Sequence, residues 1–204
     1  MDKCELVVMG ASMGGLNALE TVLKFLPSTF TAPVAVVLHR SVDSTDGLVN
    51  VLRKVSRLKI REPLDKEPIQ PGHVYIAAAD YHLLVDGCSF ALSTGAPELF
   101  ARPSIDVLFE SAAECYGSKL AAIIMTGAST DGTRGVEAVD AAGGTVIIQD
   151  PATADSPLMP RSALNAVTTD YLLSLPEIGR CLPVICGELE SSADCAIKAN
   201  THAT

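Results

Sequence analysis

Several features common in proteins of this size are missing from the 204-residue chain. It has no tryptophan and only 4% aromatic residues, and its six cysteines show no C-x-x-C spacing, which excludes a paired-cysteine metal site. No apolar run reaches the roughly 18 residues that a membrane-spanning helix needs. Positive charge is also scarce, with 15 lysines and arginines against 24 acidic residues. The resulting net charge of −9 argues against nucleic acid and anionic membranes as partners.

The remaining composition describes one globular domain. A hydrophobic fraction of 48% is enough to build a large core with nearly continuous apolar strands. The N-terminal sequence Met1-Asp-Lys-Cys lacks a secretory pattern, so we expect a cytoplasmic protein. We predict a catalytic domain over residues 1–187 and a disordered tail over 188–204, which is rich in Ser, Ala, Asn and Thr. No pattern indicates a cofactor or a metal, and none is expected.

Strand-like apolar runs alternate with helical periodicity along most of the chain. Strands are predicted at 6–9, 34–38, 58–61, 120–125, 145–148 and 171–173. Helices are predicted at 15–26, 48–55, 104–116, 131–142, 160–166 and 176–185. The alternation implies a doubly wound, three-layer α/β/α fold with a mostly parallel sheet.

One region interrupts this alternation. Between Pro71 and Thr94, the runs 74–77, 82–85 and 90–92 are separated by Asp80-Tyr81 and Asp86-Gly87. Asp-Gly between apolar runs is a strong hairpin signal. We therefore predict a small antiparallel β meander as an insertion in the parallel fold.

The stretch Gly10-Ala-Ser12-Met-Gly14 lies where the first predicted strand meets the first helix. The spacing G-x-S-x-G is that of a nucleophile elbow, in which a serine is exposed on a sharp turn near free backbone N–H groups. Two other interpretations fit the same residues: a phosphate-binding turn, or a serine that only caps the helix. The motif by itself does not decide among them.

Two further reactive groups follow other strands. His39 comes directly after the second predicted strand, and Asp131 lies in the loop after strand 120–125. The carboxyl ends of parallel strands share one edge of a sheet, so Ser12, His39 and Asp131 are predicted to converge as nucleophile, base and orienting acid. Alternatively, His39 is an ordinary packed or solvated residue, and Asp131 is only the first-turn acid of its helix.

At this point the motifs resemble a known family, the chemotaxis receptor-glutamate methylesterases (the CheB family). The resemblance covers the chain from the first strand to about Leu182. The matching motifs, in family order, are Gly10-Ala-Ser-Met-Gly-Gly15, Leu38-His39, Pro71-Gly-His-Val-Tyr-Ile-Ala77, Arg102-Pro-Ser-Ile-Asp-Val-Leu-Phe109, Thr126-Gly-Ala-Ser-Thr-Asp-Gly132, Gln149-Asp-Pro-Ala-Thr-Ala154 and Met159-Pro160.

The resemblance implies a Ser12–His39–Asp131 triad that hydrolyses glutamyl methyl esters, with glutamine deamidation as a second activity. It also implies backbone oxyanion donors at Met13 and Ala128. Many family members have threonine after the serine and Gly-Met-Gly in the aspartate loop, whereas this chain has Met13 and Ala128-Ser129. These departures are expected to reshape the pocket without removing its backbone donors.

The implied substrate is the methylated cytoplasmic domain of a chemoreceptor. Four arginines near predicted strand ends are candidates for contacting an acidic receptor surface, or are simply solvated: Arg40, Arg102, Arg134 and Arg161. Because the first strand begins within a few residues of Met1, no receiver domain is expected, and a receiver on a separate chain is a candidate partner. The alternative functions are an idle scaffold of the same fold in a chemotaxis-like pathway and a nucleotide binder; no G-x-x-x-x-G-K-[ST] or G-x-G-x-x-G motif supports the latter.

Overall fold

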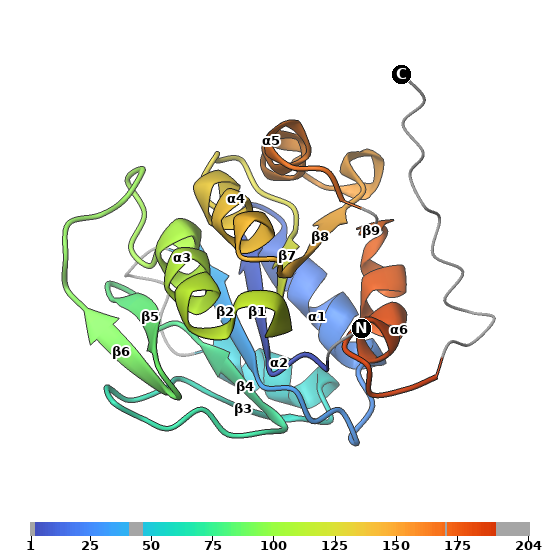
Figure 1. The fold of residues 1–204 in the computed structure, drawn as a ribbon, viewed down its shortest axis with the longest axis horizontal. Coiled ribbons are helices and arrows are strands. Elements are labelled where there is room, and N and C mark those ends of the chain that lie inside the picture. Colours follow the sequence, from blue (N-terminus) through green and yellow to red (C-terminus); the bar gives the residue numbers. More distant parts are fainter. Residues whose placement is uncertain (1–2, 41–46, 170, 191–204) are drawn as a thin grey trace.

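A seven-stranded parallel sheet forms the centre of the molecule (Figure 1). The computed structural model describes residues 3–40, 47–169 and 171–190. The sheet has the order β3-β4-β2-β1-β7-β8-β9. Its strands are β1 (Leu6–Ala11), β2 (Val34–Leu38), β3 (Lys59–Arg61), β4 (His73–Ile76), β7 (Leu120–Ile124), β8 (Thr145–Gln149) and β9 (Tyr171–Leu173).

Helices cover both faces of the sheet, which explains why its central strands are apolar throughout. In β1, Val7 and Met9 face the core shared with α1 and α6, whereas Leu6 and Val8 face the core shared with α3. Figure 1 shows α1 and α6 on one side of the sheet and α3 and α4 on the other. The helices are α1 (Gly15–Phe25), α2 (Leu48–Val55), α3 (Ile105–Tyr116), α4 (Thr133–Ala141), α5 (Leu158–Ala166) and α6 (Leu175–Ile185), with short 3-10 turns η1 (Gly117–Lys119) and η2 (Pro151–Thr153). The predicted three-layer α/β/α fold is confirmed.

The antiparallel insertion is smaller than predicted. It is the hairpin β5 (His82–Asp86) and β6 (Ser89–Ser93), which turns at Gly87 with a φ of 56°. The prediction that residues 74–77 join this insertion is wrong, because β4 pairs in parallel with β2 and β3. Tyr75 and Ile76 are both fully buried although they face opposite sides of the sheet. A run that is buried on both faces is typical of a parallel strand and not of a meander.

The folded part extends beyond the predicted domain boundary at 187. The Glu188 carboxylate accepts hydrogen bonds from the backbone N–H groups of Thr31 (2.9 Å) and Ala32 (2.7 Å), so this residue is fixed to the loop before β2. Residues 191–204 of the predicted tail lie outside the described residues. Within the described ranges, no helix is long and apolar enough to cross a bilayer.

Candidate active site

The three predicted reactive residues come from three neighbouring strands. Strands β2, β1 and β7 are adjacent in the sheet. Ser12 directly follows β1, His39 directly follows β2, and Asp131 lies between β7 and α4. The parallel sheet therefore gathers at one edge three side chains that are up to 119 residues apart in the chain (131 − 12).

Ser12 occupies a tight turn between β1 and α1. Its N–H donates to the Thr126 carbonyl (3.0 Å), and its own carbonyl accepts from the Gly15 N–H (2.8 Å). Gly14 has a φ of 77°, and a Cβ on this residue would lie 2.4 Å from the Asp155 carboxylate. The glycine is thus required both by its left-handed backbone and by close packing. The turn holds the Ser12 backbone firmly, while its hydroxyl has no hydrogen-bond partner among the described residues.

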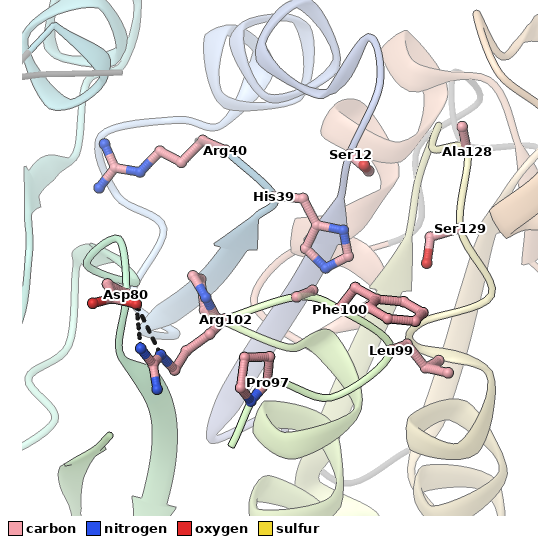
Figure 2. A pocket seen from close by; sticks show the side chains of 12 residues that line it. Ser12, His39, Arg40, Asp80, Pro97, Leu99, Phe100, Arg102, Ala128 and Ser129 are labelled. Atoms are coloured by element: carbon pink, nitrogen blue, oxygen red, sulfur yellow. Dashed lines mark hydrogen bonds and ion pairs between the residues drawn. The ribbon is translucent and has the colours of Figure 1, made fainter. Parts of the chain in front are cut away.

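The His39 imidazole is oriented by Asp131. The His39 Nε2 lies 2.7 Å from the Asp131 Oδ2. An ionised carboxylate only accepts hydrogen bonds, so Nε2 carries the proton and Nδ1 presents a lone pair. Ser12 and His39 line the same pocket, and Figure 2 shows both side chains there without a hydrogen bond between them. Nδ1 is therefore the ring nitrogen available to take a proton from Ser12.

Asp131 is fully buried and saturated with donors. Besides His39, it accepts from the Ser104 hydroxyl (2.8 Å) and from the backbone N–H groups of Ile105 (2.7 Å) and Asp106 (3.0 Å). Burial raises the pKa of the Asp131 carboxyl, but the hydrogen bonds from His39, from the two N–H groups and from Ser104 outweigh it and hold this pKa below its usual range. Although Asp131 lies just before α4, its carboxylate binds the backbone N–H groups at the start of α3. The alternative interpretation, in which Asp131 is only the first-turn acid of α4, does not describe these contacts.

A second buried carboxylate completes a reciprocal arrangement. Asp106, in the first turn of α3, accepts from the N–H groups of Gly132 (2.9 Å) and Gly135 (2.8 Å) at the start of α4. Burial, assisted by the nearby Asp131 charge, raises the pKa of Asp106. Arg134 pairs with it at 3.2 Å. Asp131, just before α4, thus binds the start of α3, and Asp106, in α3, binds the start of α4 and fixes the backbone next to Asp131.

Replacing Asp106 with alanine is expected to destabilise the fold by about 2 kcal/mol or more, because two buried N–H groups lose their acceptor. Asp140→Ala makes the same change at an exposed position of α4 and is expected to stay within about 0.5 kcal/mol of the wild type. Urea unfolding of both variants measures the difference. Equal stability of the two variants would contradict this role for Asp106.

Two backbone N–H groups next to Ser12 are free to bind an oxyanion. Neither Met13 nor Ala128 donates a backbone hydrogen bond to another described residue. The neighbouring N–H groups are already used, since Gly127 donates to the Ser156 carbonyl (3.0 Å) and Ser12 to Thr126. Ala128 also lines the pocket that contains Ser12. The N–H groups of Met13 and Ala128 are therefore not used by other backbone groups, and their role as oxyanion donors stays a prediction.

The pocket in front of these residues is open and has a volume of about 620 Å³. It is much larger than a methyl ester group, so more of the substrate than the reacting group has room to enter. Its lining residues are Ser12, His39, Arg40, Asp80, Pro97, Leu99, Phe100, Ala101, Arg102, Pro103, Ala128 and Ser129 (Figure 2).

The predicted substrate-binding arginines are only partly in this pocket. Arg40 lines it, although its guanidinium pairs with Glu62 at 2.6 Å. Arg102 also lines it, but its guanidinium is engaged by Asp80 and by nearby backbone carbonyls. Arg134 does not line this pocket and pairs with three acidic side chains, and Arg161 is exposed on α5.

Sequence reasoning missed the apolar wall of the pocket. Pro97, Leu99 and Phe100 belong to the connection between β6 and α3, in the part that precedes the motif beginning at Arg102. The one available signal was a pair of large apolar residues in a loop that contains Pro97 and ends at the helix cap Ser104. No group of three or more His, Cys, Asp or Glu side chains within the described part of the chain is placed to hold a metal ion.

Comparison with known proteins gives consistent matches. The CheB methylesterase family matches residues 7–182. A protein of Leptospira interrogans is 45% identical over 175 residues, which is 85% of this chain and 91% of that protein. A Thermotoga maritima protein named protein-glutamate methylesterase/protein-glutamine glutaminase is 38% identical over 83% of this chain and 50% of its own length. The crystal structure of the Thermotoga maritima CheB methylesterase catalytic domain superposes with a TM-score of 0.85, at 36% identity, over 89% of this chain and 98% of that domain.

Proposed function

This chain belongs to the CheB methylesterase family, and we infer that it is a hydrolase that removes methyl esters from glutamyl side chains of proteins. The observation that carries the mechanism is the His39–Asp131 pair at 2.7 Å, together with an unbonded Ser12 hydroxyl in the pocket that His39 lines. A serine, a histidine in a fixed tautomer and a buried carboxylate are the parts of a serine-hydrolase triad. We assign these roles to Ser12, His39 and Asp131.

The first half-reaction forms an acyl-enzyme. His39 Nδ1 takes the proton from Ser12 as its Oγ bonds to the ester carbonyl carbon. The carbonyl oxygen becomes an oxyanion, bound by the N–H groups of Met13 and Ala128 at about 3 kcal/mol for each donor. When the carbonyl re-forms, the bond to the methoxy oxygen breaks. The imidazolium returns its proton to that oxygen, and methanol leaves.

The second half-reaction releases the product. Water occupies the space that methanol leaves, and His39 Nδ1 takes one of its protons as its oxygen attacks the acyl carbon. Collapse of the second oxyanion breaks the bond to Ser12 Oγ, which recovers its proton from His39. The protein side chain departs as glutamate. Asp131 stays ionised throughout and stabilises the imidazolium in both halves.

The same site is suited to a primary amide. A glutaminyl side chain differs from the methyl ester only in its leaving group, so attack by Ser12 would expel ammonia after protonation by His39. We propose this deamidation as a second activity. Ammonia release from a glutamine-bearing substrate, absent in Ser12→Ala, is its measurement.

We propose methylated chemoreceptors as the substrate and the cytoplasm as the compartment. A receiver domain on a separate chain is the proposed regulatory partner. The primary test is methanol release from the purified, methylated cytoplasmic domain of a chemoreceptor from the same organism. Methanol release by wild type is the expected result. Its absence at high enzyme concentration, while the protein is folded, would refute the proposed function.

A further inference from the structure

A strained turn carries the apolar wall of the pocket. Glu98 and Ala101 exchange two backbone hydrogen bonds, N–H to carbonyl, at 3.0 and 2.8 Å. The two residues between them, Leu99 and Phe100, have φ values of 46° and 65°. Two-residue loops with positive φ at both positions strongly favour Asn-Gly, because side chains with Cβ and γ branches are strained there. A leucine-phenylalanine pair is therefore an unfavourable choice for this turn.

Burial does not compensate for this strain. The Phe100 side chain is fully exposed, and Leu99 is 50% exposed. Exposed bulky residues in a strained conformation weaken a fold, so their presence indicates a role other than stability. Both side chains line the pocket that contains Ser12 and His39 (Figure 2).

The turn is anchored on both sides. Arg102 donates through Nη1 to the carbonyls of Thr94 (3.0 Å) and Gly95 (2.8 Å) and through Nε to Asp80 (3.0 Å). One guanidinium thus ties the chain before the turn to the chain after it. Leu99 and Phe100 are consequently presented at fixed positions, which reduces the entropy lost when a partner binds them.

Exposed apolar groups also lie beside Ser12 itself. Met13, the next residue, is 61% exposed, and Leu16, in the first turn of α1, is 41% exposed. Leu16 shares with Ser12 a second depression in the surface. The apolar contacts around the nucleophile therefore continue from the pocket onto the surface of α1.

We propose that Leu99 and Phe100 form a recognition element that packs against apolar side chains flanking the esterified glutamate of the substrate protein. The occupant is thus a protein segment in which the methylated glutamate has apolar neighbours, and not an isolated ester. The pocket volume of about 620 Å³ leaves room for such a neighbour beside the ester. This proposal rests on the proposed function and adds the feature that selects its substrate.

The test replaces the pair with the residues that the turn prefers, in the double variant Leu99→Asn/Phe100→Gly. Relief of strain is expected to raise the melting temperature by roughly 2–4 °C. Loss of two apolar contacts is expected to lower kcat/KM for the methylated receptor domain at least tenfold. The loss is expected to be smaller for p-nitrophenyl acetate, which has no flanking residues to contact the turn. Leu64→Ala, at an exposed leucine outside the pocket, is the control.

Binding separates this proposal from the proposed function. In a Ser12→Ala background, the Kd of the methylated receptor domain is expected to rise at least tenfold when the turn is also changed. If wild type released no methanol, the proposed function would fail. The change in Kd caused by the Leu99→Asn/Phe100→Gly substitution would still show whether the turn binds the receptor domain. Unchanged binding and unchanged kcat/KM would overturn the proposal. So would an equal loss with both substrates, since the turn would then shape the reacting centre instead of recognising the substrate.

Discussion

A Ser12→Ala variant is expected to release methanol from methylated receptor about 10⁶-fold more slowly than wild type. The methyl group that replaces the hydroxyl cannot bond to the ester carbon, so no acyl-enzyme forms. The oxyanion donors and the pocket remain, and they sustain only the residual rate. Gas-chromatographic detection of methanol in time courses at saturating substrate measures the loss.

The control for this variant is Ser118→Ala. Ser118 is exposed in η1, before β7, and so lies at the opposite end of that strand from the Asp131 loop. It is expected to turn over substrate at the wild-type rate. Circular dichroism of both variants establishes that each is folded. Comparable methanol release by Ser12→Ala and wild type would support the idle-scaffold alternative, in which Ser12 performs no chemistry.

Asp131→Asn is expected to lower kcat by about 10⁴-fold with little change in shape. The asparagine amide can donate a hydrogen bond to His39 Nε2, which then becomes the acceptor and leaves the proton on Nδ1. The ring nitrogen beside Ser12 would carry a proton and could not act as a base. Methanol release by this variant, compared with the surface variant Asp140→Asn, measures the effect. A loss of less than about tenfold would contradict the tautomer assigned to His39.

The difference in stability between wild type and Asp131→Asn is expected to depend on pH. Hydrogen bonds hold the pKa of Asp131 below its usual range in the folded protein. An acid with a lowered folded-state pKa stabilises the fold above its unfolded pKa of about 3.9, and this stability is lost as the pH falls through the folded pKa. The free energy of unfolding of wild type should therefore exceed that of Asp131→Asn most at neutral pH. Urea titrations of both proteins should show a smaller difference in the free energy of unfolding at about pH 3 than at pH 7.

The positions of Ser12, His39 and Asp131 at one edge of the sheet could be predicted because each residue follows the end of a strand. The apolar runs before Ser12 and His39 end abruptly at small or polar residues, and parallel strands bring such ends together. The roles of Asp106 and Arg102 could not be predicted in this way. Each acts on groups brought close only by packing: Asp106 caps a helix that starts 27 residues later (133 − 106), and Arg102 binds two carbonyls and an acid across a loop.

Two errors of prediction have physical causes. The prediction groups the run 74–77 with the runs on either side of the Asp86-Gly87 hairpin signal. The continuous apolar pattern of β4 is instead that of a strand buried on both faces. Leu99 and Phe100 were overlooked because sequence rules expect Asn or Gly where φ is positive. Local rules fail where a functional requirement opposes them.

Labelling with a fluorophosphonate tests the central claim most directly, because this reagent forms a stable bond only with a serine that a base activates. Peptide mass spectrometry of wild type is expected to place the adduct on Ser12, with none in Ser12→Ala and strongly reduced labelling in His39→Gln. An unlabelled wild type, or an adduct on another serine that persists in Ser12→Ala, would contradict the assignment of Ser12 as the nucleophile.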